Sequence, residues 1–182
     1  QFEIDNEYIM SSKDLCTIGF LDQVLEAGTR ILKIEGRGRS PDYVKTTTRC
    51  YREAADAYLQ GTYNQKKINE WMISLKTVYN RGFWDGYYLG QKLGEWSNIH
   101  GSKATKKKIY LGKAKKYFTN LQVAEFNMET MQLNEGDEIL ITGTTTGVIE
   151  TTAGEIRLNN KQVKAVKKGD NFSMKLAYII RP

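Results

Sequence analysis

The sequence of 182 residues contains little cysteine, histidine or proline. Two cysteines, Cys16 and Cys50, are too few for a disulfide framework, and the single histidine, His100, excludes a His-rich metal site and leaves few options for a catalytic triad. No run of about 18 apolar residues occurs, so we expect no membrane span. The amino end lacks a charged leader followed by an apolar core, which favours a cytoplasmic protein over a secreted one.

The distribution of charge indicates a class of partner. The net charge is +6, and residues 1 to 102 hold 13 basic and 13 acidic side chains, whereas residues 103 to 182 hold 14 basic and 8 acidic ones. The excess of positive charge therefore lies in the second part of the chain. It predicts a polyanionic partner such as RNA, and a solvated lysine-rich surface is the alternative interpretation.

Apolar residues recur at helical spacing in the first half of the chain and predict three helices. The first covers residues 11 to 27, with Ser11 and Asp14 as a capping box. The second begins at Ser40, with Pro41 at its first position, and the third lies near 65 to 79.

Residues 30 to 35, RILKIE, alternate in the manner of a strand between the first two helices. Leu32 and Ile34 would share one face, with Lys33 and Glu35 on the other. A helix-strand-helix unit is typical of a parallel sheet, but one strand cannot make a sheet. Because the first residue is also not methionine, we expect the chain to be the carboxyl-terminal piece of a longer protein. Processing of a complete protein is the alternative.

The helical period disappears after the polar stretch 97 to 108, where short alternating runs separated by turn signals begin. These runs predict a small closed antiparallel β-barrel over residues 109 to 182. The expected organisation is thus a first domain of α/β class over 1 to 96, a linker over 97 to 108 and an all-β domain over 109 to 182.

Four motifs in order carry a resemblance to a known family: SSKDLC at 11 to 16, LKIEGRGRSPDYV at 32 to 44, CYREAADAY at 50 to 58 and YNRGFWDGYYLG at 79 to 90. Together they resemble the carboxyl-terminal part of the collagenase-like peptidases of family U32. Residues 123 to 150 resemble domain two of elongation factor Tu, a small barrel that family members also carry. The resemblance implies that 1 to 96 are the last units of a (β/α) TIM-type barrel whose amino-terminal part is missing here.

The resemblance also implies candidate activities. Family members include proteins that hydroxylate RNA pyrimidines or quinone precursors, with cysteines that hold an iron-sulfur cluster, and the RNA-modifying members use prephenate. We therefore expect the intact protein to hydroxylate a pyrimidine base in tRNA or rRNA, and this segment alone to be inactive. A collagenase-like peptidase and a non-catalytic docking module for RNA or protein are the alternatives. A peptidase would need a catalytic nucleophile paired with a general base, and this sequence shows no recognisable example.

In a barrel of parallel strands the chemistry lies at the carboxyl ends of the strands, which for RILKIE means the charged stretch that follows it. Lys33 and Glu35 would face the barrel lumen as catalytic residues, and an internal ion pair with only a packing role is the alternative. Arg37 and Arg39 follow on the loop, and Ser40 begins the next helix. We expect these three residues to bind a dicarboxylate such as prephenate or an RNA phosphate.

Four further features remain. Cys16, in the first turn of its expected helix, would favour the thiolate, and the resemblance makes it one ligand of an incomplete iron-sulfur site. Cys50 is expected to be a small buried residue. Residues 80 to 90 offer aromatic faces for base stacking, with Arg81 for phosphate, or else pack in the core. Residues 107 to 117, KKIYLGKAKKY, predict either an RNA-facing strand or an edge strand protected by lysine.

Overall fold

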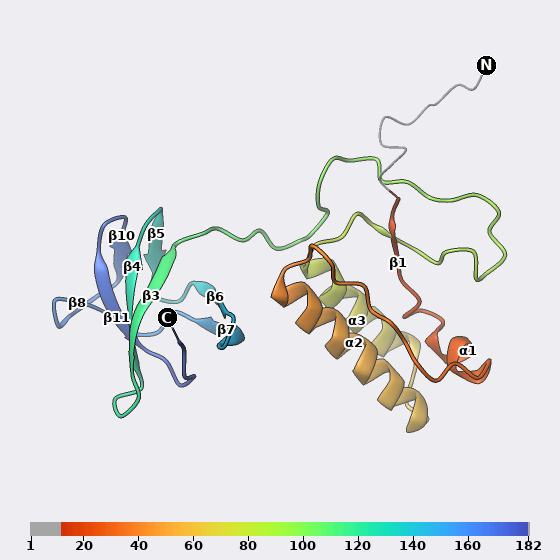
Figure 1. Cartoon of the computed structure of the whole chain (residues 1–182), viewed down its shortest axis with the longest axis horizontal. Helices are drawn as coiled ribbons and strands as arrows, with labels where there is room; N and C mark the ends of the chain where they lie inside the picture. The colour runs from red at the N-terminus through yellow and green to blue at the C-terminus, as the bar shows by residue number, and fades with distance from the viewer. Residues whose placement is uncertain (1–11, 182) are drawn as a thin grey trace, which may run out of the picture. The chain divides into compact units, whose positions relative to one another are not determined.

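The computed structural model describes residues 12–181, which form two compact units that divide between Lys107 and Lys108 (Figure 1). Each unit has its own hydrophobic core. Every helix in the described range is too short or too polar to cross a membrane. The first unit is a mixed helix and strand structure, and the second consists of antiparallel strands.

The first unit contains two long helices and one pair of very short strands. Its elements are β1 (Asp14–Leu15), α1 (Leu21–Glu26), α2 (Pro41–Leu59), α3 (Gln65–Thr77) and β2 (Phe83–Trp84). The strands β1 and β2 pair in parallel. The helices α2 and α3 pack side by side, and their buried residues Cys50, Ala54, Ala57, Ile68, Trp71 and Leu75 form one cluster with Cys16, Ile18 and Leu21.

The second and third predicted helices are confirmed, and local signals explain where they begin. Pro41 occupies the first position of α2, where its missing N–H would have no helical partner, and Ser40 precedes it in an extended conformation. Asn64 caps α3, since its side chain accepts a hydrogen bond from the backbone N–H of Lys67 at 3.1 Å.

The predicted helix over 11 to 27 is wrong for most of its length. Ser11 lies outside the described residues, and only the six residues of α1 are helical. The backbone N–H of Asp14 donates to the carbonyl of Gly82 at 2.8 Å, and that of Cys16 donates to Trp84 at 3.0 Å. These donors are used across the β1–β2 pair, so they are not available to a helix.

The predicted strand over 30 to 35 is also wrong. The segment has no regular secondary structure and no strand partner among the residues that the structure describes. Ile31 is 87% exposed and Leu32 is exposed as well, so the alternation has no buried face to favour it. The parallel pair that the sequence failed to reveal is instead β1 with β2.

The described residues of the second unit form nine strands, every pair of which is antiparallel. They are β3 (Gly112–Phe118), β4 (Val123–Met128), β5 (Gln132–Asn134), β6 (Glu138–Gly143), β7 (Gly147–Thr152), β8 (Ile156–Leu158), β9 (Lys161–Val163), β10 (Ala165–Lys167) and β11 (Asn171–Lys175). Five of them form a sheet in the order β3-β4-β11-β8-β9, while β5 pairs with β10 and β6 pairs with β7.

The predicted antiparallel strands are therefore confirmed, but the predicted closed barrel is not. In the described part of the chain no ladder joins the edges β3 and β9 of the large sheet. The hairpin β6–β7 and the long-range pair β5–β10 bond only within themselves and so leave the sheet open. Ala124, Ile156 and Phe172 lie in the hydrophobic core that these strands enclose.

Candidate functional site

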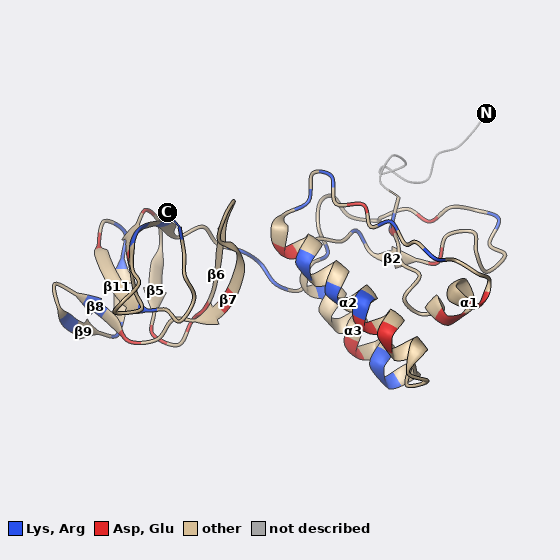
Figure 2. Cartoon of the chain, turned by 60° about the horizontal axis from the view of Figure 1, so that its bottom comes forward, with Lys and Arg blue, Asp and Glu red and all other residues tan. Residues whose placement is uncertain are grey.

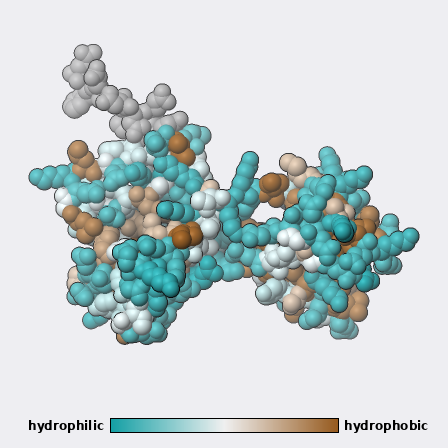
Figure 3. All heavy atoms as spheres, turned by 180° about the vertical axis from the view of Figure 1, so that it is seen from behind, coloured by the Kyte–Doolittle hydropathy of each residue, from teal (hydrophilic) through white to brown (hydrophobic). Residues whose placement is uncertain are grey.

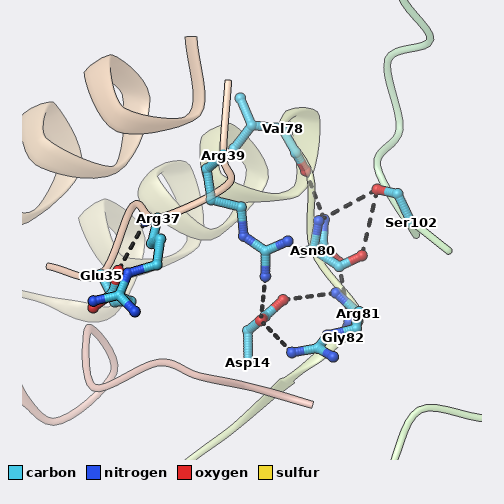
Figure 4. A network of polar contacts seen from close by, with 9 residues as sticks. All are labelled: Asp14, Glu35, Arg37, Arg39, Val78, Asn80, Arg81, Gly82 and Ser102. Carbon is cyan, nitrogen blue, oxygen red and sulfur yellow. Dashed lines mark hydrogen bonds and ion pairs between the residues drawn. The ribbon is translucent and has the colours of Figure 1, made fainter. Parts of the chain in front are cut away.

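Asp14 on β1 joins two arginines from separate parts of the first unit (Figure 4). Its Oδ1 lies 3.3 Å from Nη2 of Arg39, which precedes α2, and 3.6 Å from Nη2 of Arg81, which precedes β2. Its Oδ2 accepts a hydrogen bond from the backbone N–H of Arg81 at 2.8 Å. Of the predicted site residues, the structure thus brings Arg39 and Arg81 together.

Aromatic rings hold the Arg39 guanidinium in place. Its central carbon lies 4.0 Å from the ring centroid of Tyr79 and 5.6 Å from that of Tyr43. Nε of Arg81 is buried without a hydrogen-bond partner. Two guanidinium groups here share the carboxylate of Asp14 in a partly desolvated place. Such a pair suits a carboxylate or phosphate group of a ligand.

The turn before β2 fixes the position of Arg81. Asn80, only 3% exposed, donates from Nδ2 to the carbonyl of Val78 at 2.9 Å, and its Oδ1 accepts from the N–H of Gly82 at 3.1 Å. Gly82 has a φ of 89°, a left-handed conformation that an L side chain rarely adopts. Ser102 Oγ accepts from the backbone N–H of Asn80 at 3.3 Å (Figure 4).

A small cavity of about 30 Å³ lies beside Asp14 and is lined in part by Cys16, Thr47 and Tyr51. This volume corresponds to about one water molecule. Oγ1 of Thr47 is buried and has no hydrogen-bond partner. The hydroxyl of Tyr51 accepts from the backbone N–H of Thr17 at 2.9 Å and donates to Sγ of Cys16 at 3.8 Å.

Cys16 does not have the helical environment that the sequence predicts. It follows β1 directly, and burial raises the pKa of its thiol, an effect to which the charges of Asp85 and Asp14 add. The hydrogen bond from Tyr51 opposes this rise. The expectation of a thiolate favoured by a helix dipole is therefore wrong, because no helix begins at this residue. Burial also raises the pKa of Tyr51, which keeps its hydroxyl protonated.

The described residues do not fit a complete iron-sulfur cluster. They contain no group of three or more His, Cys, Asp or Glu side chains arranged to hold a metal ion. Sγ of Cys50 faces the carbonyl of Trp71 at 3.9 Å inside the core, and burial raises the pKa of this thiol to about 11. Its predicted role as a small buried residue is confirmed. Cys16 is thus the one thiol of this part of the chain that borders a cavity.

Three other predicted site residues, Lys33, Glu35 and Arg37, lie outside the Asp14 network, which consists of Asp14, Arg39 and Arg81. Lys33, Glu35 and Arg37 are exposed, and Oε1 of Glu35 accepts from the backbone N–H of Arg37 at 2.8 Å (Figure 4). No ion pair joins Lys33 to Glu35 within residues 12–181, so the predicted internal pair is absent because its segment is not a buried strand. The backbone carbonyl of Ser40 accepts from Val44 in the first turn of α2.

In the segment 80 to 90 the predicted core packing is confirmed for Phe83, and base stacking stays a prediction. Phe83 packs against the core of the first unit, whereas Tyr87 and Tyr88 are exposed. Asp14 and Tyr51 lie within the motifs at 11 to 16 and 50 to 58, but neither was predicted to be a site residue. Asp14 lies on a strand of two residues that Cys16 follows, and a pattern this short does not indicate a site.

The comparisons with known proteins agree with the four motifs. The model of peptidase family U32 matches residues 1–98, more than half of the chain. A protein named collagenase from Porphyromonas gingivalis strain W83 is 53% identical over 182 residues, which cover 100% of this chain and 44% of the relative. A protein named tRNA hydroxylation protein P1 from Bacillus subtilis is 32% identical over 143 residues, 75% of this chain and 32% of the relative.

The chain therefore spans half or less of the length of these curated relatives. A crystal structure of the C-terminal domain of a Geobacillus thermoleovorans protein assigned to the U32 peptidases aligns with 41% of this chain and 93% of its own, at 14% identity and a TM-score of 0.39. That likeness is too distant to support an inference. The family match and the resemblance in the sequence lead to the same conclusion, that the chain belongs to peptidase family U32.

Proposed function

We propose that the protein of which this chain is a part hydroxylates a pyrimidine base in tRNA or rRNA, in the cytoplasm, with prephenate and an iron-sulfur cluster. One observation carries the proposal. Cys16 and Asp14 border the same cavity, and Asp14 holds the cationic pair Arg39 and Arg81. A thiol that can bind a metal, beside two guanidinium groups that can bind an anion, suits oxidation of RNA or use of a dicarboxylate better than peptide hydrolysis.

The protonation state of Cys16 supports the same choice. A cysteine peptidase needs a thiolate activated by a nearby base, whereas burial keeps the Cys16 thiol protonated and its hydrogen-bonding neighbours are Tyr51 and Met72. A metal ion displaces the proton of a coordinating thiol, so a raised pKa is compatible with a ligand. Because the described residues supply one such thiol, the other ligands would come from sequence outside this chain.

The proposal includes a fold, in which β1 and β2 are neighbouring strands of a (β/α) TIM-type barrel. Their parallel pairing and the helices α2 and α3 between them are consistent with βα units. Cys16 follows the carboxyl end of β1, the end at which active sites of such barrels lie. Relatives named tRNA hydroxylation proteins in Bacillus subtilis and Escherichia coli add support.

The second candidate function is a collagenase-like peptidase. The specific observation that favours it is the name collagenase carried by the Porphyromonas gingivalis relatives, which are 53% and 52% identical to this chain. Glu35 would be its acid or base. The exposed position of Glu35, on a segment without a nucleophile beside it, is why we place this function second.

Mass spectrometry of RNA nucleosides from a strain that lacks the gene tests the leading proposal. We expect a hydroxylated pyrimidine to disappear from tRNA or rRNA and to return with the wild-type gene. The Cys16→Ser gene should not restore it, whereas the matched Cys50→Ser gene should. Anaerobically purified intact protein should contain iron and sulfide, and the Cys16→Ser variant should contain much less. Unchanged hydroxylation in both RNA classes of the deletion strain would overturn the proposal.

A separate assay tests the peptidase. Purified intact protein should cleave gelatin if the second candidate is right, and the Glu35→Gln variant should lose that activity. Arg30→Gln is a suitable control, because it removes an exposed charge of the same segment at a residue with no predicted catalytic role. Absence of gelatin cleavage by the wild-type protein eliminates this function.

A further inference from the structure

The second unit carries a basic groove that lies outside the Asp14 network. The groove has a volume of about 560 Å³ and is lined by residues of β3, of the turn that follows it and of the segment Ile179 to Arg181. Lys115, Lys116 and Arg181 are its cations. No aspartate or glutamate occurs from residue 109 to 124 or from 171 to 182, so both segments that form the groove are free of negative side chains.

A β-bulge places two neighbouring lysines on the outside of the sheet. In a regular strand Lys115 and Lys116 would point to opposite faces. The register between β3 and β4 shifts between Ala114 and Lys116, and both lysines are exposed. Lysine on an edge strand also prevents aggregation, but that role needs neither a second adjacent lysine nor an arginine from another segment.

Neutral groups contact the side chains of the two lysines, and the backbone of Arg181 is fixed by a hydrogen bond. Nζ of Lys115 donates to Oδ1 of Asn171 at 2.7 Å, and Nζ of Lys116 lies 4.7 Å from the ring centroid of Phe118. The backbone N–H of Arg181 donates to Oγ1 of Thr146 at 2.9 Å. Glu125 is the cross-strand neighbour of Lys116, but no ion pair links them in the described residues.

Apolar and aromatic side chains border the same groove. Tyr117 lines it and is fixed by a hydrogen bond from its hydroxyl to the carbonyl of Leu176 at 3.0 Å. Ile179, which also lines the groove, is 62% exposed. Figure 3 shows apolar atoms in brown beside hydrophilic atoms in teal on the second unit, and Figure 2 shows its lysines and arginines in blue.

We propose that this groove binds single-stranded RNA, with phosphates at Lys115, Lys116 and Arg181 and bases against the ring of Tyr117. A cationic groove with aromatic borders is the arrangement that binds single strands, because cations follow the backbone while bases stack on side-chain rings. The inference rests on the proposed function in taking RNA as the partner, and it assigns the contact to the second unit.

Fluorescence anisotropy with a labelled oligouridylate of about 12 nucleotides tests the groove. The protein carrying Lys115→Gln, Lys116→Gln and Arg181→Gln should bind at least about 10-fold more weakly than wild type near physiological salt. The slope of log affinity against log salt should shrink by about 2, since three phosphate contacts are lost at roughly 0.7 each. Circular dichroism should show unchanged folding, because all three side chains are exposed.

The matched control removes the same charge elsewhere in the second unit through Lys161→Gln, Lys164→Gln and Lys168→Gln. All three lysines are exposed, and Lys161 lies on β9 at the sheet edge opposite β3. The control should keep its affinity within about 3-fold, because only general attraction is reduced. Equal loss in both variants, or no binding by wild type, overturns the proposal. Equal displacement of the RNA by polyglutamate at the same charge concentration also overturns it, in favour of an acidic protein partner.

The two proposals fail separately. If the deletion strain keeps its hydroxylated pyrimidine while the triple variant loses RNA binding, the proposed reaction is wrong and the groove stands. If the deletion strain loses the modification while both triple variants bind alike, the reaction stands and the groove is wrong.

Discussion

The two units place their polar side chains differently. The buried polar residues of the described chain, Asp42, Thr46, Thr47, Asn80 and Ser97, all belong to the first unit. In the described part of the second unit every buried residue is apolar. Burial of a polar group costs free energy unless the group is hydrogen-bonded, so polar interiors are kept where they position a turn or a site.

This difference indicates where each unit acts. In the first unit, Asn80 fixes the turn that presents Arg81, and Thr47 borders the cavity next to Cys16. In the second unit, charge lies on the outside of the sheet, where Lys115 and Lys116 border a groove. The first unit is thus suited to an interior site, and the second is suited to contact with a partner along its surface.

The largest expected effect concerns the apolar core of the second unit. Ile156 is fully buried, so Ile156→Ala should lower the free energy of unfolding by about 2 to 5 kcal/mol, through lost burial and a residual cavity. Ile179→Ala, at an exposed position of the same unit, should change it by less than about 0.5 kcal/mol. Urea denaturation followed by circular dichroism measures both. Similar losses in the two variants would mean that the second unit is not organised around this core.

A smaller effect is expected from the polar interior of the first unit. Asp14→Asn removes the charge that Arg39 and Arg81 share and should cost about 1 to 3 kcal/mol of unfolding free energy. Glu155→Gln breaks the more exposed ion pair with Arg157 in the second unit and should cost less than about 1 kcal/mol. Urea denaturation of both variants compares the units directly. An equal or larger effect of Glu155→Gln would refute the special role of the Asp14 network.

The sequence predicted elements whose signals are local. The helix α2 begins with Pro41 and α3 is capped by Asn64, and both have an apolar stripe, so their positions follow from neighbouring residues. The strands β1 and β2 have two residues each and pair across 69 positions, as Asp14 with Phe83 shows, so no local period reveals them. The segment 30 to 35 has the opposite property, because its strand-like alternation has no partner within the described chain.

The same reasoning explains which site residues the sequence could reveal. Arg39 and Arg81 belong to charged or aromatic motifs and could be selected by residue type alone. Their convergence on Asp14 depends on the β1–β2 pair, and the cavity beside Cys16 depends on packing against Tyr51 of α2. Such convergence across distant segments requires coordinates, because side-chain chemistry does not encode it.

A further expected effect on stability is a pH dependence carried by the buried thiol of Cys50. Burial raises the pKa of Cys50 from its ordinary value of 9.0 to about 11, so the folded protein binds more protons than the unfolded chain between these values. The resulting stabilisation is complete below pH 9 and is lost as the pH rises toward 11. Urea midpoints of the wild type should therefore fall over this range more steeply than those of Cys50→Ala.

Thiol labelling tests the burial of the two cysteines in the folded protein, which this explanation requires. With a disulfide reagent at about pH 8, neither Cys16 nor Cys50 should react in the folded protein, because both thiols are buried and protonated, and both should react in urea. Fast labelling of Cys16 alone would mean that the cavity beside it opens to solvent. The site of the first unit would then be exposed, as the groove of the second unit is. Labelling of Cys50 would contradict the packing of α2 against α3, since its sulfur faces the carbonyl of Trp71 across that interface.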